Sequence, residues 1–385
     1  MTNHFPIFAR PVPTTPDLSV DEVYARLRRY HELLHIRRAG RDDAASAGYC
    51  SPQDLDAFFD TFETDFPAGS GDPDIPELDI LRKRATQFVT ARIAAVQAIT
   101  DGLRMEDRGA VKKAIGHAKA VGVVDLTRMH EIIAELHARA PWMAPAAAVI
   151  QRAMERATIA GPAPFHTPPL ILLGKPGIGK SAWARDLARA FSLPVIDVDV
   201  GATQGATFAI SGTERGWSSA APGRVVSTIL ATQVVNPLII IDELDKLPAN
   251  VASTRGSLPG AAEALKSMIE PTTAKSWTCP YYRVPVNLSR VSWLMTTNSL
   301  AGLPAALLDR CKVVTIGDPS PADLHAAALR MLAGRIADPH LRVALADTIA
   351  AQVIRRRRLG HRTSLRQIAR AVARIEDMPD RVWDM

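Results

Sequence analysis

A short glycine- and lysine-containing segment constrains the fold of this chain more than any other feature. It reads Gly174-Lys-Pro-Gly-Ile-Gly-Lys-Ser181 and matches the pattern G-x-x-x-x-G-K-[ST] at every fixed position. The apolar run Leu170–Leu173 precedes it, and a helix-like stretch over 180–191 follows it. A strand, a glycine-rich turn and a helix in this order predict the first unit of a parallel α/β sheet.

Four further apolar runs indicate more strands of the same sheet, at residues 195–200, 238–241, 291–295 and 313–316. Continuous apolar runs are typical of strands that are buried on both faces of a parallel sheet. The pattern is helical after Asp318. The predicted fold is therefore an α/β P-loop sheet flanked by helices, with an N-terminal helical region (1–145), a nucleotide-binding domain (146–317) and a C-terminal helical lid (318–385).

The N-terminal third has helical periodicity over 18–65 and again over 76–140, with a turn-rich break between them. Ser19 followed by Glu22 predicts a capping box at the start of the first helix. This region contains no motif that carries chemistry. We expect it to serve in assembly or in contact with a client.

Composition limits the class of protein. Hydrophobic residues make up 47% and charged residues 22% of the chain, as in soluble globular proteins. No apolar run reaches the ~20 residues that a membrane span requires. The first 17 residues are polar and proline-rich, and the three cysteines have no paired or metal-ligand spacing, so we expect a cytoplasmic protein without membrane contact.

The net charge of +6 leaves nucleic-acid binding open as an alternative. Its main support is the run Arg355–Arg358. A basic run on a helix is more simply interpreted as a solvated face, and no aromatic residues interleave with it.

The glycine loop predicts a phosphate site. Glycines let the backbone N–H groups turn toward phosphate oxygens, and the following helix adds its positive end. Lys180 would reach the β and γ phosphates, and Ser181 would offer its hydroxyl to Mg²⁺. The loop residues expected to bind nucleotide are Gly174, Lys175, Pro176, Gly177, Ile178, Gly179, Lys180 and Ser181.

Two acids end the apolar run Leu238–Ile241. Carboxylates at the C-terminal end of a buried strand face the crevice where open α/β sheets bind ligands. Asp242 is expected to hold Mg²⁺, and Glu243 is expected to orient and polarise the attacking water. Together with the loop, they predict hydrolysis of a nucleoside triphosphate.

Residues 168–372 resemble an AAA+ module, and within that class they are most similar to the ATPase part of Lon proteases. The segments that carry the resemblance are Gly216–Arg224, Asp242–Leu247, Tyr282–Ser289, Thr297-Asn298 and Leu307–Arg310, in the family's order. The preference for ATP over GTP is implied by this resemblance, because a phosphate loop does not read the base.

The resemblance implies further roles. Asn298 matches the sensor-1 position, which helps to place the lytic water. Arg310 matches the arginine finger that a neighbouring subunit supplies, which implies a homo-oligomeric ring, with six subunits as the expected number. Arg366 matches sensor 2, and Arg362, four residues earlier on the same helical face, is its rival.

Trp217 matches the aromatic residue of the pore loop with which such rings grip a polypeptide, and 250–260 would form a second pore loop. The family usually has an aliphatic residue after the aromatic, whereas Ser218 follows here. The chain ends shortly after Arg366, where Lon would continue into its serine-lysine protease domain, so we expect no proteolysis by this chain alone.

The leading hypothesis is therefore an ATPase that remodels or unfolds a protein client. A nucleotide-dependent switch or scaffold, a motor on nucleic acid and the ATPase half of a two-chain protease are the alternatives.

Overall fold

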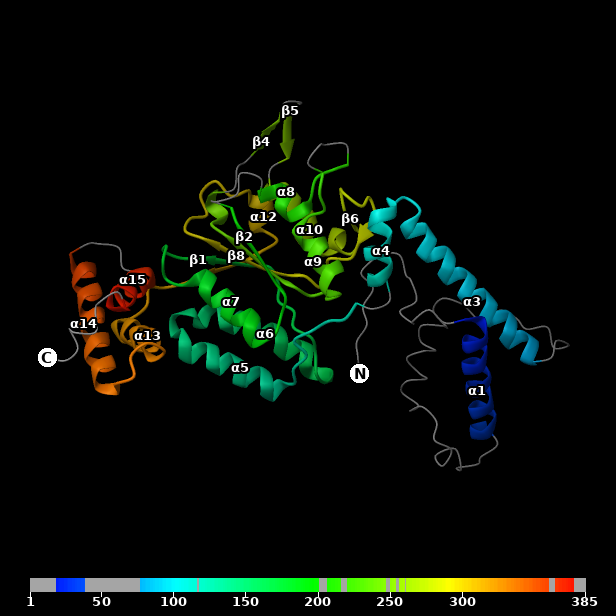
Figure 1. Cartoon of the computed structure of the whole chain (residues 1–385), viewed down its shortest axis with the longest axis horizontal. Coiled ribbons are helices and arrows are strands. Elements are labelled where there is room, and N and C mark those ends of the chain that lie inside the picture. The colour runs from blue at the N-terminus through cyan, green and yellow to red at the C-terminus, as the bar shows by residue number, and fades with distance from the viewer. Residues whose placement is uncertain are drawn as a thin grey trace. The chain divides into compact units, whose positions relative to one another are not determined.

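The computed structural model describes residues 19–38, 77–115, 118–200, 206–215, 220–246, 250–253, 256–259, 261–359 and 364–376 (Figure 1). The chain divides between Ala118 and Lys119 into two compact units.

The smaller unit contains three described helices, α1 (Val20–Arg38), α3 (Glu77–Thr100) and α4 (Met105–Ala114). Helices α1 and α3 pack together through the buried side chains of Val23, Leu27, Leu81, Ala85 and Phe88. The predicted capping box at the start of α1 is confirmed, because the Ser19 amide donates to Glu22 Oε2 at 2.7 Å and the Glu22 amide donates to Ser19 Oγ at 3.3 Å.

The larger unit is built on a five-stranded sheet with the strand order β2-β3-β8-β1-β9. Its strands are β1 (Leu170–Leu173), β2 (Val195–Asp199), β3 (Leu238–Asp242), β8 (Ser292–Thr297) and β9 (Lys312–Thr315), and all neighbours are parallel. The five predicted strands and the parallel α/β class are confirmed. The strand β8 runs further than its apolar core, because the hydroxyl-bearing residues Thr296 and Thr297 are fully buried in the sheet.

Helices surround this sheet. They are α5 (Leu126–Arg139), α6 (Ala144–Ala157), α7 (Lys180–Ala190), α8 (Ala206–Ser211), α9 (Arg224–Thr232), α10 (Ala261–Ile269), α11 (Pro271–Ala274) and α12 (Ala305–Leu308), with short 3-10 turns at Pro141–Met143, Thr158–Ala160 and Leu244–Lys246. Two small antiparallel pairs complete the unit: β4 (Asn250–Ser253) with β5 (Gly256–Pro259), and β6 (Trp277–Thr278) with β7 (Pro285–Val286).

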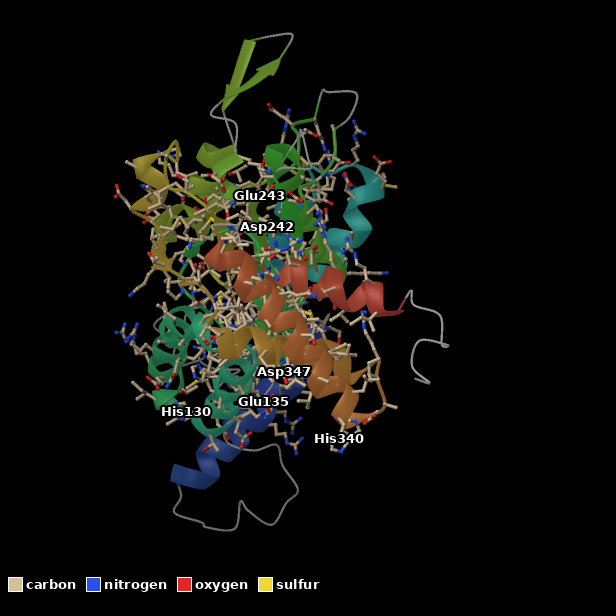
Figure 2. The ribbon with its side chains drawn as sticks, turned by 90° about the vertical axis from the view of Figure 1, so that its left-hand side faces the viewer. His130, Glu135, Asp242, Glu243, His340 and Asp347 are labelled. Carbon is tan, nitrogen blue, oxygen red and sulfur yellow. The ribbon has the colours of Figure 1, made fainter. Side chains whose placement is uncertain are left out.

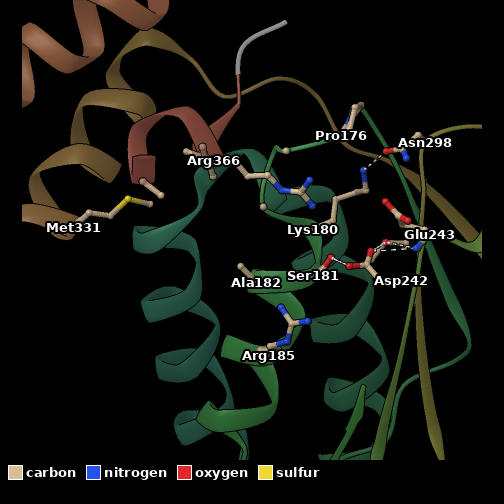
Figure 3. A pocket seen from close by; sticks show the side chains of 15 residues that line it. Pro176, Lys180, Ser181, Ala182, Arg185, Asp242, Glu243, Asn298, Met331 and Arg366 are labelled. Carbon is tan, nitrogen blue, oxygen red and sulfur yellow. Dashed lines mark hydrogen bonds between the residues drawn. The ribbon is translucent and has the colours of Figure 1, made fainter. Parts of the chain in front are cut away.

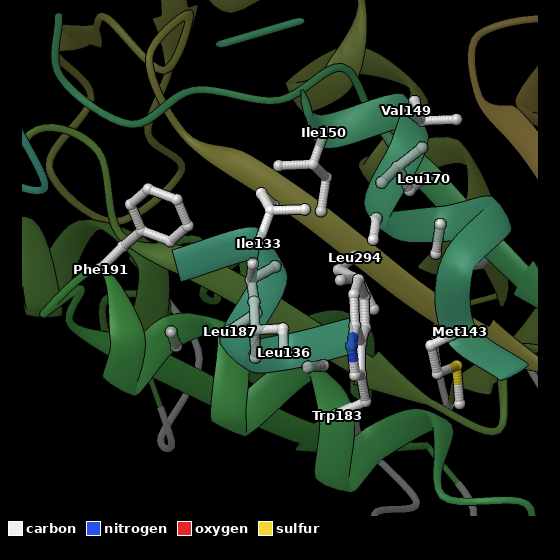
Figure 4. Close-up of a cluster of buried hydrophobic side chains, with 14 of the residues drawn as sticks. Ile133, Leu136, Met143, Val149, Ile150, Leu170, Trp183, Leu187, Phe191 and Leu294 are labelled. Carbon is white, nitrogen blue, oxygen red and sulfur yellow. The ribbon is translucent and has the colours of Figure 1, made fainter. Parts of the chain in front are cut away.

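The main core lies between one face of the sheet and helices α5, α6 and α7 (Figure 4). Leu170 and Leu172 of β1 and Leu294 of β8 face this layer and are fully buried. Trp183 and Leu187 of α7 lie four residues apart and meet the same layer. Alternate side chains of the strands point to this face, so α7 packs against the sheet there. This packing also positions the loop before α7.

The helical character predicted over 76–140 takes the form of three helices, α3, α4 and α5, with non-helical segments between them. Residues 118–124 are not helical, and in this segment Lys119 pairs with Val234 and Val124 pairs with Ala163. A new helix then starts at Asp125, whose carboxylate accepts from the Arg128 amide at 2.8 Å. Residues 119–145 pack in the larger unit, whereas the three-part division assigned them to the N-terminal region; as functional divisions, its bounds stay a prediction.

Three helices form the C-terminal part of the larger unit: α13 (Pro321–Ala333), α14 (Pro339–Arg358) and α15 (Leu365–Glu376). They share a core of their own, whose buried members include Leu324, Leu332, Ala346, Ile368 and Val372. We call these three helices the lid. Within the described residues, no helix combines the length and the apolar character that crossing a bilayer would need.

We expect Leu294→Ala to lower the stability of the larger unit by about 2 to 5 kcal/mol, because it opens a cavity in the fully buried central strand. Val195→Ala, on the exposed side of the edge strand β2, should cost no more than about 1 kcal/mol. Urea unfolding followed by tryptophan fluorescence measures both. Equal shifts of the two midpoints would contradict the position of the core.

Candidate nucleotide site

The glycine loop joins β1 to α7 and is held by the neighbouring strand, since the Gly174 amide donates to the Thr297 carbonyl of β8 at 3.2 Å. Gly177 and Gly179 have φ angles of +82° and +90°, which side-chain-bearing residues adopt only with strain. A Cβ at Gly177 would also lie 2.3 Å from the Cβ of Ser364. These two glycines therefore make the turn that brings the loop amides to the start of α7.

Two contacts tie the loop to the helices around it. The Leu365 amide, at the start of α15, donates to the Gly177 carbonyl at 2.8 Å. The Trp142 indole Nε1 donates to the Ile178 carbonyl at 2.9 Å. The loop is thus in contact with the lid on one side and with the segment before α6 on the other.

A pocket of about 400 Å³ opens beside the loop (Figure 3). Its lining comes from the loop, α7, the ends of β3 and β8, and the lid: Pro176, Gly177, Gly179, Lys180, Ser181, Ala182, Arg185, Asp242, Glu243, Thr296, Asn298, Met331, Leu365, Arg366 and Ala369. The glycine loop and the two acids, far apart in the sequence, therefore share one cavity.

Lys180 is the most enclosed charge of the pocket, with 6% of the residue exposed. Its Nζ donates to the carbonyls of Gly174 and Lys175 at 2.6 and 2.9 Å and to Asn298 Oδ1 at 3.1 Å. Burial lowers its pKa, and the nearby carboxylates of Asp242 and Asp245 oppose that shift. The ammonium group is held at the mouth of the loop, where it can meet a phosphate.

Asp242 ends β3 and accepts three hydrogen bonds. Ser181 Oγ donates to its Oδ2 at 2.7 Å, Thr296 Oγ1 donates to its Oδ1, and the Glu243 amide donates to Oδ1 at 3.1 Å. Burial would raise the pKa of Asp242, but the hydrogen bonds from Thr296, Ser181 and Glu243 together hold it below its ordinary value. The group is therefore a carboxylate throughout the neutral range.

The oxygen atoms of Ser181 and Asp242 fit Mg²⁺, which prefers hard oxygen ligands. Among the residues that the structure describes, no group of three or more His, Cys, Asp or Glu side chains could hold a metal by itself. A magnesium ion bound beside a nucleotide typically takes one or two protein ligands and completes its shell with phosphate oxygens and water.

Glu243 follows Asp242 directly, and Figure 2 labels the two acids among the side chains of the chain. Its φ angle is +59°, so the backbone turns sharply at this residue and the side chain leaves the strand direction. Its Oε2 accepts from Lys246 Nζ at 2.5 Å. The turn separates the two acids, so that Asp242 meets Ser181 and Glu243 meets Lys246.

Asn298 stands at the end of β8 beside Lys180. Asp245 positions this end of the strand, because its Oδ1 accepts from Thr297 Oγ1 at 3.0 Å and from the Asn298 amide at 3.2 Å. The segment after β3 thus fixes the segment after β8, and the Asn298 side chain faces the same space as Glu243.

Of the predicted arginines that the structure describes, Arg366 lies at the pocket and Arg310 lies away from it. Arg366 lines the pocket from the lid, while its rival Arg362 lies outside the described residues. Arg310 is not among the described residues that line this pocket; it makes an ion pair with Glu270, and its Nη1 donates to the Ala306 carbonyl at 2.6 Å. Trp217 also lies outside the described residues.

Not every residue of the glycine loop faces the pocket. Lys175 points to Asp318, with Nζ and Oδ2 2.6 Å apart, and the side chain of Ile178 is buried in the core. Gly174 lies against Ile316, where a Cβ would be 2.9 Å from the Ile316 carbonyl oxygen. These three residues support the loop from behind.

Sequence reasoning missed three residues of the site: Thr296, Asp245 and Arg185. Arg185 lies four residues after Ser181 on α7, so a helical reading from the loop could have found it; its guanidinium pairs with Asp197, the closest atoms being 2.6 Å apart. Thr296 carries no sequence signal of its own, because only the placement of β8 beside β3 brings it to Asp242.

Comparison with known proteins finds a family that matches the region with the glycine loop and the two acids. Residues 170–317 match the family described as "ATPase family associated with various cellular activities (AAA)". The match spans the sheet from β1 to the residues that follow β9. This part of the chain is therefore similar to the ATPase domains of that family.

The relatives include Lon proteases. The chain is 37% identical over 152 residues to "Lon protease homolog, mitochondrial" of Yarrowia lipolytica, covering 40% of this chain and 12% of the relative. It is 31% identical over 209 residues to "Lon protease" of Bacillus thuringiensis, covering 53% and 25%, and 30% identical over 173 residues to "Lon protease homolog 2, peroxisomal" of Oryza sativa subsp. indica, covering 45% and 19%. The chain thus spans a quarter or less of the length of these relatives, and the similarity is confined to part of each protein.

We expect Thr296→Val to shift the acid limb of the ATPase pH profile to higher pH. The hydrogen bond from Thr296 lowers the pKa of Asp242, so its removal raises that pKa and protonates Asp242 earlier as the pH falls. The measurement is kcat/KM for Mg·ATP between pH 5 and pH 9. Thr315→Val, on the exposed end of the edge strand β9, is the matched control; a shift of the same size in both variants would refute the role of Thr296.

Proposed function

We propose that this chain hydrolyses ATP at the pocket beside the glycine loop and uses the energy to remodel or unfold a protein client within a homo-oligomeric ring. The observation that carries the proposal is the convergence of Lys180, Asp242, Glu243, Asn298 and Arg366 on one cavity between the sheet and the lid.

The proposed chemistry follows from these positions. Lys180 binds the β and γ phosphates, while Ser181 and Asp242 hold Mg²⁺, which neutralises charge on the phosphate oxygens when bound. Glu243 orients the attacking water and polarises it as a general base. Asn298, fixed beside Lys180, helps to place that water against the γ phosphate.

Arg310 supports a shared site. It lies outside the lining of its own subunit's pocket as the structure describes it, and phosphoryl transfer gains ~10³ to 10⁵ in rate from an arginine supplied in trans. We propose that Arg310 serves the pocket of a neighbouring subunit. A ring, with six subunits as the expected number, closes such head-to-tail contacts.

The lid gives the proposed cycle its moving part. Its contacts with the loop are the Leu365–Gly177 hydrogen bond and the packing of Ser364 on Gly177, both at the phosphate turn. Binding and loss of the γ phosphate at this turn would shift the lid between two positions, and the pore loop around Trp217 would move the client.

The names of the relatives include proteolysis, which we do not carry over, since the similarity covers a quarter or less of their length. A regulatory switch or scaffold, a motor on nucleic acid and the ATPase half of a two-chain protease are the competing functions. The cytoplasmic location stays a prediction.

The first test is the steady-state ATPase rate of the wild type, Glu243→Gln and Arg310→Ala at increasing protein concentration. We expect the specific rate of the wild type to rise as subunits assemble. Glu243→Gln should lose on the order of 10²- to 10³-fold in kcat, and Arg310→Ala ~10³-fold. A rate independent of concentration, with Arg310→Ala still active, would contradict the ring and favour a monomeric switch.

The second test concerns the client. We expect reduced, carboxymethylated α-lactalbumin, a permanently unfolded polypeptide, to stimulate the wild-type ATPase. Trp217→Ala should lower the ratio of stimulated to unstimulated rate at least several-fold, because a planar aromatic side chain grips a chain without sequence preference. Ser219→Ala, in the same segment, is the control. Stimulation by duplex DNA with a steep salt dependence, and none by the polypeptide, would favour the nucleic-acid motor.

A further inference from the structure

The arginine that we place in trans is held within its own subunit by a carboxylate. Glu270 Oε2 makes an ion pair with Arg310 Nε, and the Ala306 carbonyl accepts from Arg310 Nη1 at 2.6 Å. The Glu270 and Arg310 side chains are 30% and 28% exposed, so water shields the pair only in part. Nη1 is thereby held by a hydrogen bond, while Nε lies against the Glu270 carboxylate in an ion pair without making a hydrogen bond.

The partners of Arg310 come from two different elements. Ala306 lies in α12, the short helix that ends just before Arg310. Glu270 is the residue between α10 and α11; its amide donates to the Lys266 carbonyl at 3.0 Å and its carbonyl accepts from the Ala274 amide at 2.8 Å. The backbone N–H and C=O of Glu270 are thus both held by hydrogen bonds, which fixes the position from which its side chain extends.

This geometry leaves one edge of the guanidinium free. With Nη1 hydrogen-bonded and Nε in the ion pair, Nη2 has no partner among the residues that the structure describes. A guanidinium is planar, so fixing two of its nitrogens also fixes the direction of the third. An arginine on a long flexible side chain is otherwise spread over many rotamers, and a phosphate gains most from a donor that is already oriented.

We propose that Glu270 is a positioning residue that orients Arg310 toward the phosphates bound by the neighbouring subunit. This inference rests on the proposed function, because it requires Arg310 to act in trans. Glu270 lies outside the described lining of the nucleotide pocket, and it acts on the rate of the next subunit's site through the direction of Arg310.

We expect Glu270→Gln to lower kcat on the order of 10-fold, less than Arg310→Ala, because the arginine is still present but is no longer held. In the Arg310→Ala background, Glu270→Gln should cause no further loss of kcat. Glu270→Asp, which keeps the charge on a shorter side chain, should recover part of the rate. Glu131→Gln, which breaks the exposed Arg128–Glu131 pair of 2.8 Å on α5, is the matched control and should keep the wild-type kcat.

The decisive experiment mixes subunits. In a ring of Glu270→Gln subunits alone, each site has its own Glu243 but an unheld arginine from its neighbour. In a ring of Glu243→Gln subunits alone, each site lacks the base. Where a Glu270→Gln subunit meets a Glu243→Gln neighbour, one site receives both an intact Glu243 and a held Arg310. We therefore expect co-expressed rings, purified through two different tags, to hydrolyse ATP faster than either parent.

The outcomes separate the two levels of the proposal. Recovery in both the Glu270→Gln and the Arg310→Ala mixtures with Glu243→Gln supports the inference. Recovery with Arg310→Ala but not with Glu270→Gln would overturn the positioning role while leaving the shared site intact. Recovery with neither would overturn the trans role of Arg310 itself. Circular dichroism of Glu270→Gln and Glu270→Asp shows whether each variant folds, and a kcat of Glu270→Gln equal to that of the wild type would also refute the inference.

Discussion

The strand β8 lies between β1 and β3, and the site depends on this placement. Parallel neighbours put the ends of all three strands at the same edge of the sheet, so the glycine loop after β1 and the acids after β3 flank the end of β8. From there, Thr296 reaches Asp242 on one side, Thr297 holds the loop through Gly174, and Asn298 meets Lys180. Three consecutive polar residues thus join the glycine-loop side of the pocket to the side of Asp242.

Burial of charge explains why these polar contacts are so dense. Lys180 has little access to water, and an ammonium group in such a place is stable only when carbonyls and carboxylates surround it. The same reasoning applies to Asp242, whose hydrogen bonds offset the effect of burial on its pKa. The pocket is therefore arranged as a set of fixed dipoles before a nucleotide arrives, which is the arrangement that electrostatic catalysis of phosphoryl transfer requires.

Much of the fold could be predicted from the sequence, because its five strands are apolar runs that only a buried parallel sheet accommodates. The glycine loop and the pair Asp242-Glu243 could be found for a related reason: their chemistry needs particular residues at fixed spacing after a strand. The helical stretch over 76–140 was harder. Residues 118–124 separate two helices, and Lys119 and Val124 pair there with Val234 and Ala163; a local periodicity contains no information about such distant partners.

The sequence by itself determined which residues form the glycine loop, which two acids follow the strand, and that the chain resembles AAA proteins. Each of these depends on residue types in a local order. Only the tertiary structure decided which residues support them. Thr296 and Asp245 join the site through hydrogen bonds between separate strands, and Glu270 meets Arg310 from another element. These pairings follow from strand order and helix packing, which depend on the sum of many weak contacts along the whole chain and not on any short motif.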